Sequence, residues 1–314
     1  MADARAGSPP ITVGVTGASG FLGGALSAVL VSGGAFVHRF VRGRAAAPGE
    51  IAWDPSRGVL DPAALEGLDA VVHFSGASLA SGRWTEARKR ELRESRVGST
   101  RTLARAIAAC RVPPRVLVSG SAVGWYGDRG DEPLDESSAP GQGFLAEMAR
   151  DWETAAAPAA EAGVRVAHPR TGLVLARGGG VLAALERPFA FGLGGPLASG
   201  RAWWSWVALG DFVRAIRFAM RDERIRGPFN LVAPAPVRQG EFARALGRAL
   251  HRPAIAPAPA FALRALLGRE MVDDMLLASQ RAQPAVLLGA GFQFEEPALE
   301  PCLLRLYART PAAR

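Results

Sequence analysis

The chain has 314 residues, of which 49% are hydrophobic and 21% are charged, and its formal net charge at pH 7 is +8. This length and composition exclude a disordered chain and suit one large α/β domain with a smaller addition. Lys89 is the only lysine, so nearly all of the positive charge is arginine. No basic cluster is interleaved with aromatic residues, which disfavours nucleic acid as a partner.

Cys110 and Cys302 are the only cysteines, and they are too far apart to form a recognisable metal or redox motif. The first ten residues are polar and lack the apolar core of a secretion signal. The apolar helical stretches are interrupted before they reach the length of a membrane span. We therefore expect a cytoplasmic protein with reduced cysteines, no metal and no membrane partner.

A glycine-rich corner follows the first predicted strand. Ile11, Val13 and Val15 form a short apolar run typical of a buried parallel strand, and helical spacing begins at Phe21. Glycines between such a strand and helix let backbone N–H groups approach a dinucleotide pyrophosphate, although a merely structural turn is the alternative. The predicted cofactor contacts at this corner are Gly17, Ser19, Gly20, Phe21, Leu22 and Gly23.

The second predicted strand, 35–41, is followed by Arg42, with no acidic residue before Glu50. In a dinucleotide fold an acid at this place holds the adenine ribose, whereas a guanidinium suits a 2′-phosphate. Arg42 therefore favours NADP(H) over NAD; the alternative is a surface arginine in an arginine-rich chain.

The next buried strand spans 69–74 and is followed by the small residues Ser75, Gly76 and Ala77, which let a cofactor pass close to the backbone. Phe74, Ser75, Gly76 and Ala77 are therefore predicted cofactor contacts. His73 lies inside the strand, and we expect it to be a hydrogen-bonded core histidine.

A long charged helix is predicted over 85–109, followed by a strand over 116–119 and the loop SGSAVGWYGDRGDEP. A loop at the carboxyl edge of a parallel sheet is where a substrate binds. A helix over 144–160 and a strand over 164–168 come next.

The segment 173–204 is rich in glycine and aromatic residues and suits a lid or a substrate-facing wall. Beyond it, Asp211 is expected to cap a helix, and a last strand is predicted over 229–232. The sequence therefore predicts that the whole chain has three regions. These are a Rossmann domain over 1–172 whose core continues in 205–232, the segment 173–204, and a small helical region over 233–314. The predicted fold class is α/β, with a Rossmann-type doubly wound parallel sheet and a smaller, mostly helical C-terminal region on the substrate side.

Several motifs resemble the extended and atypical short-chain dehydrogenase/reductases, and more narrowly the NADP-binding epimerase family proteins with a small C-terminal domain of unknown function. Besides TGASGFLG and PRTGLVL, the matches are GRWT at 82–85, SRV at 95–97, SAVGWYGD at 121–128, FLA at 144–146, DWE at 151–153, GGP at 194–196 and APAP at 233–236. The resemblance implies a Rossmann-type domain, NADP(H) and relatives among nucleotide-sugar epimerases. In related folds, two subunits often associate through helices like the one predicted over 85–109. The resemblance therefore allows this chain to form a homodimer.

The chain departs from the superfamily at its Tyr-x-x-x-Lys pair. Aligning Glu153 with the glutamate that commonly follows that pair puts Leu145 and Ala149 at the tyrosine and lysine positions, and neither can transfer a proton. The resemblance makes Ser121 the substrate-polarising serine, and Tyr126 could supply the missing phenol. Packing beneath the loop is the alternative for Tyr126. Arg170, in the PRTG motif, is a further predicted cofactor contact.

Two functions remain open. The first is an NADP(H)-dependent oxidoreductase or epimerase-like enzyme acting on an unknown small polar substrate, with Ser121 and Tyr126 as the catalytic candidates. The alternative is a catalytically weak or inactive NADPH-binding sensor or regulatory protein that acts through protein partners.

Overall fold

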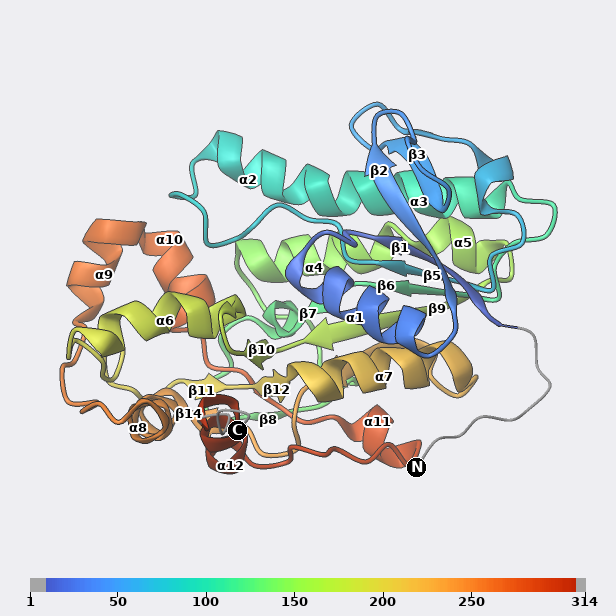
Figure 1. The fold of residues 1–314 in the computed structure, drawn as a ribbon. Coiled ribbons are helices and arrows are strands. Elements are labelled where there is room, and N and C mark those ends of the chain that lie inside the picture. The colour runs from blue at the N-terminus through green and yellow to red at the C-terminus, as the bar shows by residue number, and fades with distance from the viewer. Residues whose placement is uncertain (1–9, 309–314) are drawn as a thin grey trace.

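The computed structural model describes residues 10–308, which fold around one central, mostly parallel sheet (Figure 1). The strand order is β13-β9-β6-β5-β1-β2-β3-β4, with β7 beside β9, and only the β3–β4 pair is antiparallel. The strands are β1 (Thr12–Thr16), β2 (Phe36–Arg42), β3 (Glu50–Asp54), β4 (Val59–Leu60), β5 (Ala70–His73), β6 (Val116–Ser119), β7 (Ser121–Ala122), β9 (Arg165–Thr171) and β13 (Gly227–Leu231).

Helices cover both faces of this sheet. On one face α1 (Phe21–Ser32) packs beside α7 (Leu209–Arg221). The opposite face carries α2 (Glu86–Arg93), a π-helical turn (Glu94–Gly98), α3 (Ser99–Ala108), α4 (Phe144–Thr154) and α5 (Ala157–Glu161). The predicted doubly wound α/β fold is confirmed.

Strand alternation explains these two layers, because successive side chains of a strand point to opposite faces. Val13 and Val15 of β1 are fully buried in one core cluster together with Leu26 of α1. Val71 of β5 belongs to the other cluster with Leu103 of α3. Both faces of the sheet are thus apolar and covered, as a parallel sheet requires.

The helical region beyond the sheet builds a second core. It contains β10 (Leu173–Ala176), α6 (Gly180–Ala190), β11 (Trp203–Trp204), β12 (Trp206–Ala208), β14 (Val237–Arg238), α8 (Gln239–Leu250), α9 (Ala260–Leu267), α10 (Arg269–Met271), a π-helical turn (Val272–Leu276), α11 (Ala285–Gly289) and α12 (Leu299–Tyr307). Trp204 and Phe242 pack edge to face in its centre. Two short strands, β15 (Arg281–Ala282) and β8 (Pro133–Leu134), join this region to the loop that follows β6. The C-terminal helices are therefore fastened to the edge of the sheet that carries the predicted substrate loop.

Three local predictions need correction. Strands β3 and β4 were not expected from the sequence. The helix predicted over 144–160 is two helices, because Pro158 lies in the first turn of α5 and cannot continue a preceding helix. Asp211 does not cap α7, which begins at Leu209; its carboxylate instead accepts the backbone N–H groups of Glu295 and Glu296.

Within residues 10–308, no helix is long and apolar enough to cross a bilayer, and no group of three or more His, Cys, Asp and Glu side chains could hold a metal ion.

Candidate functional site

The glycine corner has the geometry that a dinucleotide site needs. Gly17 has φ +64°, a conformation that side chains disfavour. A Cβ on Gly23 would lie 2.3 Å from the Gly17 carbonyl oxygen, so only glycine lets α1 start this close to β1. The N-cap Gly20 gives α1 no side-chain cap, and Ser19 and Gly20 are exposed. The first turn of α1, with Phe21 and Leu22, thus keeps its N–H groups open toward an anion.

The end of β5 lies directly beside this corner. A Cβ on Gly17 would touch the backbone of Phe74 and Ser75. Thr16 accepts the N–H groups of both residues at its hydroxyl and bonds Nδ1 of His73 at 2.8 Å. Gly76 is exposed, and the Ala77 N–H donates to Ser95. The structure therefore brings Gly17, Phe74, Ser75 and Gly76 to one place at the carboxyl edge of the sheet.

His73 is a core residue with both ring nitrogens in hydrogen-bonding distance of hydroxyls, those of Thr16 and Ser99. Burial lowers its pKa to about 3, so the imidazole is neutral. The expected structural role for His73 agrees with this geometry.

Arg42 ends β2, is exposed and forms no ion pair among residues 10–308. The nearest acid along the chain, Glu50, is already engaged: it pairs with Arg39 and accepts the N–H groups of Ala46 and Ala47. At the end of β2, where an NAD-binding protein has an acidic residue that binds the ribose, this chain therefore has the guanidinium of Arg42.

Ser121 lies on β7, opposite Arg170 of β9 in the strand register. Its hydroxyl donates to Oε1 of Glu153 on α4 at 2.6 Å. Arg170 holds the same carboxylate with two hydrogen bonds, Nε to Oε1 at 2.9 Å and Nη2 to Oε2 at 3.0 Å. The Arg170 and Glu153 side chains are 3% and 10% exposed, so this is a buried, bidentate ion pair.

This placement favours an internal role for Arg170 over the cofactor contact expected from the sequence. Its guanidinium lies 3.9 Å from the centre of the Trp125 ring and also donates to the Tyr126 hydroxyl at 3.2 Å. Every edge of the guanidinium is occupied by protein. Arg170 therefore positions Glu153 instead of reaching toward a ligand.

Tyr126 is completely buried, and its hydroxyl oxygen lies 2.7 Å from the Asn230 side-chain oxygen and 2.9 Å from the Asp135 carbonyl oxygen, either of which can accept its proton. Burial raises the pKa of its phenol. A phenol enclosed in this way has no path to a substrate, so the geometry favours the packing interpretation that the sequence left open.

Leu145 and Ala149 both lie on α4 and are buried. Neither places a titratable group near Ser121. The acids of the loop after β7 are also engaged elsewhere: Asp128 accepts the N–H groups of Gly130 and Ser279, and Asp131 pairs with Arg238. Among the candidates, Glu153 is the acid in contact with Ser121.

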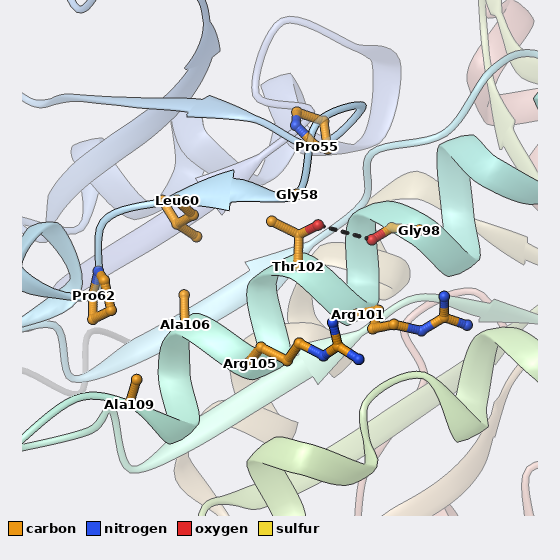
Figure 2. Close-up of a pocket in the computed structure, with 10 residues that line it drawn as sticks. All are labelled: Pro55, Gly58, Leu60, Pro62, Gly98, Arg101, Thr102, Arg105, Ala106 and Ala109. Atoms are coloured by element: carbon orange, nitrogen blue, oxygen red, sulfur yellow. Dashed lines mark hydrogen bonds between the residues drawn. The ribbon is translucent and has the colours of Figure 1, made fainter.

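A separate pocket of about 370 Å³ lies on the flank of α3 (Figure 2). Its lining includes the exposed Arg101 and Arg105 and the turn at Gly58, and it contains none of the predicted site residues. The pocket is therefore distinct from the carboxyl edge of the sheet.

A family model described as the NAD dependent epimerase/dehydratase family matches residues 13–231. The chain belongs to this family. A second model, a domain of unknown function named DUF1731, matches residues 258–306 of the C-terminal helical region. The resemblance read from the motifs is thereby confirmed.

Relatives cover nearly the whole chain. An epimerase family protein of Mycobacterium bovis is 45% identical over 282 residues, which are 90% of this chain and 93% of that protein. The crystal structure of human epimerase family protein SDR39U1 with NADPH matches with a TM-score of 0.87 and 32% identity, covering 96% of this chain and 100% of the other. A nucleoside-diphosphate sugar epimerase from Corynebacterium glutamicum matches with a TM-score of 0.76 and 36% identity, covering 95% of this chain and 58% of its own. Members of the epimerase/dehydratase family have an NAD(P)-binding fold, and this chain shares it.

The sequence did not reveal the Ser121–Glu153 contact or the part played by Asn230. Glu153 is 32 residues from Ser121, and only the packing of α4 over β7 joins them. The sequence allowed Glu153 to pair with Arg150 or Arg170, and the structure shows the pair with Arg170, but the contact with Ser121 could not be predicted from spacing.

Proposed function

We propose that this protein is an NADP(H)-dependent oxidoreductase or epimerase-like enzyme that acts on a small polar substrate. The observation that carries the proposal is the hydrogen bond from Ser121 to Glu153 at the carboxyl edge of the sheet. This pair offers a route for a proton where the superfamily's tyrosine and lysine are replaced by Leu145 and Ala149.

The residues present fit the cofactor. The close approach of Gly23 to Gly17 and the uncapped first turn of α1 suit a pyrophosphate. Arg42, which has no acidic partner among residues 10–308, suits a 2′-phosphate. The NADPH in the human relative supports the same preference. When bound, the nicotinamide would accept or supply a hydride.

Ser121 would act on the substrate oxygen. Because its own proton is directed at Glu153, the Ser121 oxygen has lone pairs left to accept a hydrogen bond from a substrate hydroxyl. When a substrate alcohol is oxidised, its hydroxyl proton would pass to Ser121 and the Ser121 proton to Glu153, while the bound nicotinamide would accept the hydride, which leaves a carbonyl. Arg170 keeps the carboxylate in place, and reduction of a carbonyl would run the same transfers backwards.

The test is a single-turnover screen. The protein with NADP+ is mixed with small polar alcohols, and with NADPH it is mixed with the corresponding carbonyl compounds, while the reduced nicotinamide is followed by absorbance. We expect stoichiometric hydride transfer with at least one compound class and its loss in Ser121→Ala. Transfer that is unchanged in Ser121→Ala would contradict the proposed chemistry.

A second candidate function follows from the two apolar residues of α4 that stand at the expected tyrosine and lysine positions. Since Leu145 and Ala149 remove the usual proton donor, the chain could serve as an NADPH-binding sensor that acts through protein partners. Capture of a defined protein partner only in the presence of NADPH would support this function. Hydride transfer to a small molecule in the screen above would count against it.

A further inference from the structure

Arg96 is a buried cation in an unusual part of the fold. It lies in the π-helical turn Glu94–Gly98, which joins α2 to α3, and it is only 9% exposed. Single π-helical turns inside longer helices occur frequently at functional sites. Arginine is almost never buried to this extent unless a carboxylate or another anion pairs with it.

No carboxylate of residues 10–308 pairs with Arg96. Its one hydrogen bond runs from Nη1 to the Leu92 carbonyl at 3.2 Å, and its guanidinium lies 5.4 Å from the Trp152 ring centre. Burial lowers its pKa to about 10, and the nearby Arg88 adds to this effect. Nε and Nη2 have no partner in the described part of the chain, yet neither is fully enclosed. The charge is thus compensated by little more than an aromatic face and one carbonyl.

The guanidinium lies between the ends of β5 and β6. A Cβ on Gly76, in the loop after β5, would come within 3.1 Å of Cζ of Arg96. Trp152 closes the other side, since a Cβ on Gly120 would come within 2.9 Å of its ring. Ser121 follows Gly120, and Glu153 follows Trp152. The Trp152 ring therefore lies against both Arg96 and Gly120, the residue before Ser121.

Two other places could hold an anion. Helix α1, whose first turn suits the pyrophosphate, packs on the opposite face of the sheet from α3, whereas Arg96 lies against Gly76, a predicted cofactor contact. Arg101 and Arg105, further along the same helix, are exposed to solvent in the flank pocket (Figure 2). Of these three places, Arg96 is the one that combines a buried charge with free donors and contact with Trp152.

We propose that Arg96 binds an oxyanion of the substrate, a carboxylate or a phosphate, next to the group that reacts at Ser121. The bound oxyanion supplies the counter-charge that the protein lacks, and the free Nε and Nη2 donors give a bidentate geometry. This assignment narrows the substrate to an anionic compound and rests on the proposed function.

Two small anions, malonate and inorganic phosphate, test the site in the full-length protein loaded with NADPH. The Tm is measured against anion concentration at an ionic strength held constant with sodium chloride. We expect a saturable rise in Tm for wild type with at least one of the anions, its loss in Arg96→Met, and its retention in Arg101→Gln, which removes an exposed charge from the same helix. No rise in wild type, or an equal rise in Arg96→Met, would overturn the proposal.

Stability without anion separates a binding role from a structural one. Because methionine fills similar space without a buried charge, Arg96→Met should melt at or above the wild-type Tm in the absence of malonate and phosphate. Failure of this variant to fold, or a Tm several degrees lower, would show that Arg96 holds the fold and would overturn the proposal.

The oxyanion that Arg96 binds could belong to the substrate or to the cofactor. The affinity of the Arg96 variant for NADPH distinguishes these two sources. We expect Arg96→Met to bind NADPH as wild type does, and malonate to bind in addition to NADPH. Competition between the anion and NADPH would overturn the assignment to substrate. If wild type binds no NADPH but shows an Arg96-dependent anion effect, the anion site stands while the proposed function fails.

Discussion

The Ser121 hydroxyl donates to a Glu153 carboxylate that Arg170 holds with two hydrogen bonds in the interior. The hydroxyl proton is therefore directed at Glu153, and the lone pairs of the Ser121 oxygen are left to accept a hydrogen bond. This polarity fits a substrate hydroxyl better than it fits a carbonyl, so oxidation is the direction in which Ser121 is prepared to act.

Removal of the Ser121 hydroxyl should strongly lower the rate of hydride transfer. Ser121→Ala is expected to lower the single-turnover rate by roughly 10²–10⁴-fold, the usual contribution of a general acid–base group, with NADPH affinity unchanged. Ser119→Ala is the matched control, because the Ser119 hydroxyl is buried without a partner in the described chain. A rate loss in both variants would point to disturbance of the loop.

Neutralising Glu153 should destabilise the fold. Glu153→Gln leaves the Arg170 charge buried without its counter-ion, and breaking such a pair lowers the free energy of unfolding by about 3–5 kcal/mol. Asp151→Asn, on the same helix, breaks a half-exposed pair with Arg93 and should lower it by only about 0–1 kcal/mol. Urea unfolding measures both, and equal losses would contradict the buried-pair account.

A methyl group on Gly23 should close the nucleotide site. Gly23→Ala puts a Cβ against the Gly17 carbonyl at 2.3 Å, which forces α1 away from β1. We expect NADPH affinity to fall roughly tenfold or more, as measured by quenching of tryptophan fluorescence. Gly210→Ala, in the first turn of α7, meets no atom within 4 Å and should bind NADPH normally. Unchanged affinity in Gly23→Ala would place the cofactor elsewhere.

The buried His73 should make the protein sensitive to mild acid. Its folded-state pKa of about 3 lies below the unfolded value near 6.5, so below pH 6.5 the unfolded chain takes up a proton that the folded chain does not. The free energy of unfolding should therefore fall by about 2 kcal/mol between pH 7.5 and pH 5 through this group alone. Urea unfolding of His73→Gln should show a smaller fall, whereas the exposed His251→Gln should behave as wild type.

The sequence predicted the features that depend on local order. Alternating and continuous apolar runs predicted β1, β5 and β6 to within a residue or two. The glycine corner was predictable because Gly17, Gly20 and Gly23 act within seven residues of one another. Strands β3 and β4 were missed, since β3 buries only Ile51 and Trp53 and β4 has two residues.

The site was less predictable because its contacts join distant segments. Asn230 reaches the Tyr126 hydroxyl from β13, across 104 residues of sequence. That Arg96 meets no carboxylate among residues 10–308 is a property of packing, and no sequence pattern marks it. The sequence could name Ser121 and Tyr126 as candidates, but only the fold shows that the Tyr126 phenol is bonded inside the protein while the Ser121 hydroxyl contacts the Glu153 carboxylate.

Titration with NADPH and, separately, with NADH is the most direct test of the central proposal that this chain binds NADP(H). We expect wild type to bind NADPH more tightly, and Arg42→Ala to weaken NADPH by roughly 10- to 100-fold while leaving NADH unchanged, since a hydrogen bond to a charged group contributes about 1.5–3 kcal/mol. Arg111→Ala, an exposed arginine in the loop between α3 and β6, controls for the lost charge. Equal affinity for the two nucleotides, or no binding of either, would contradict the account.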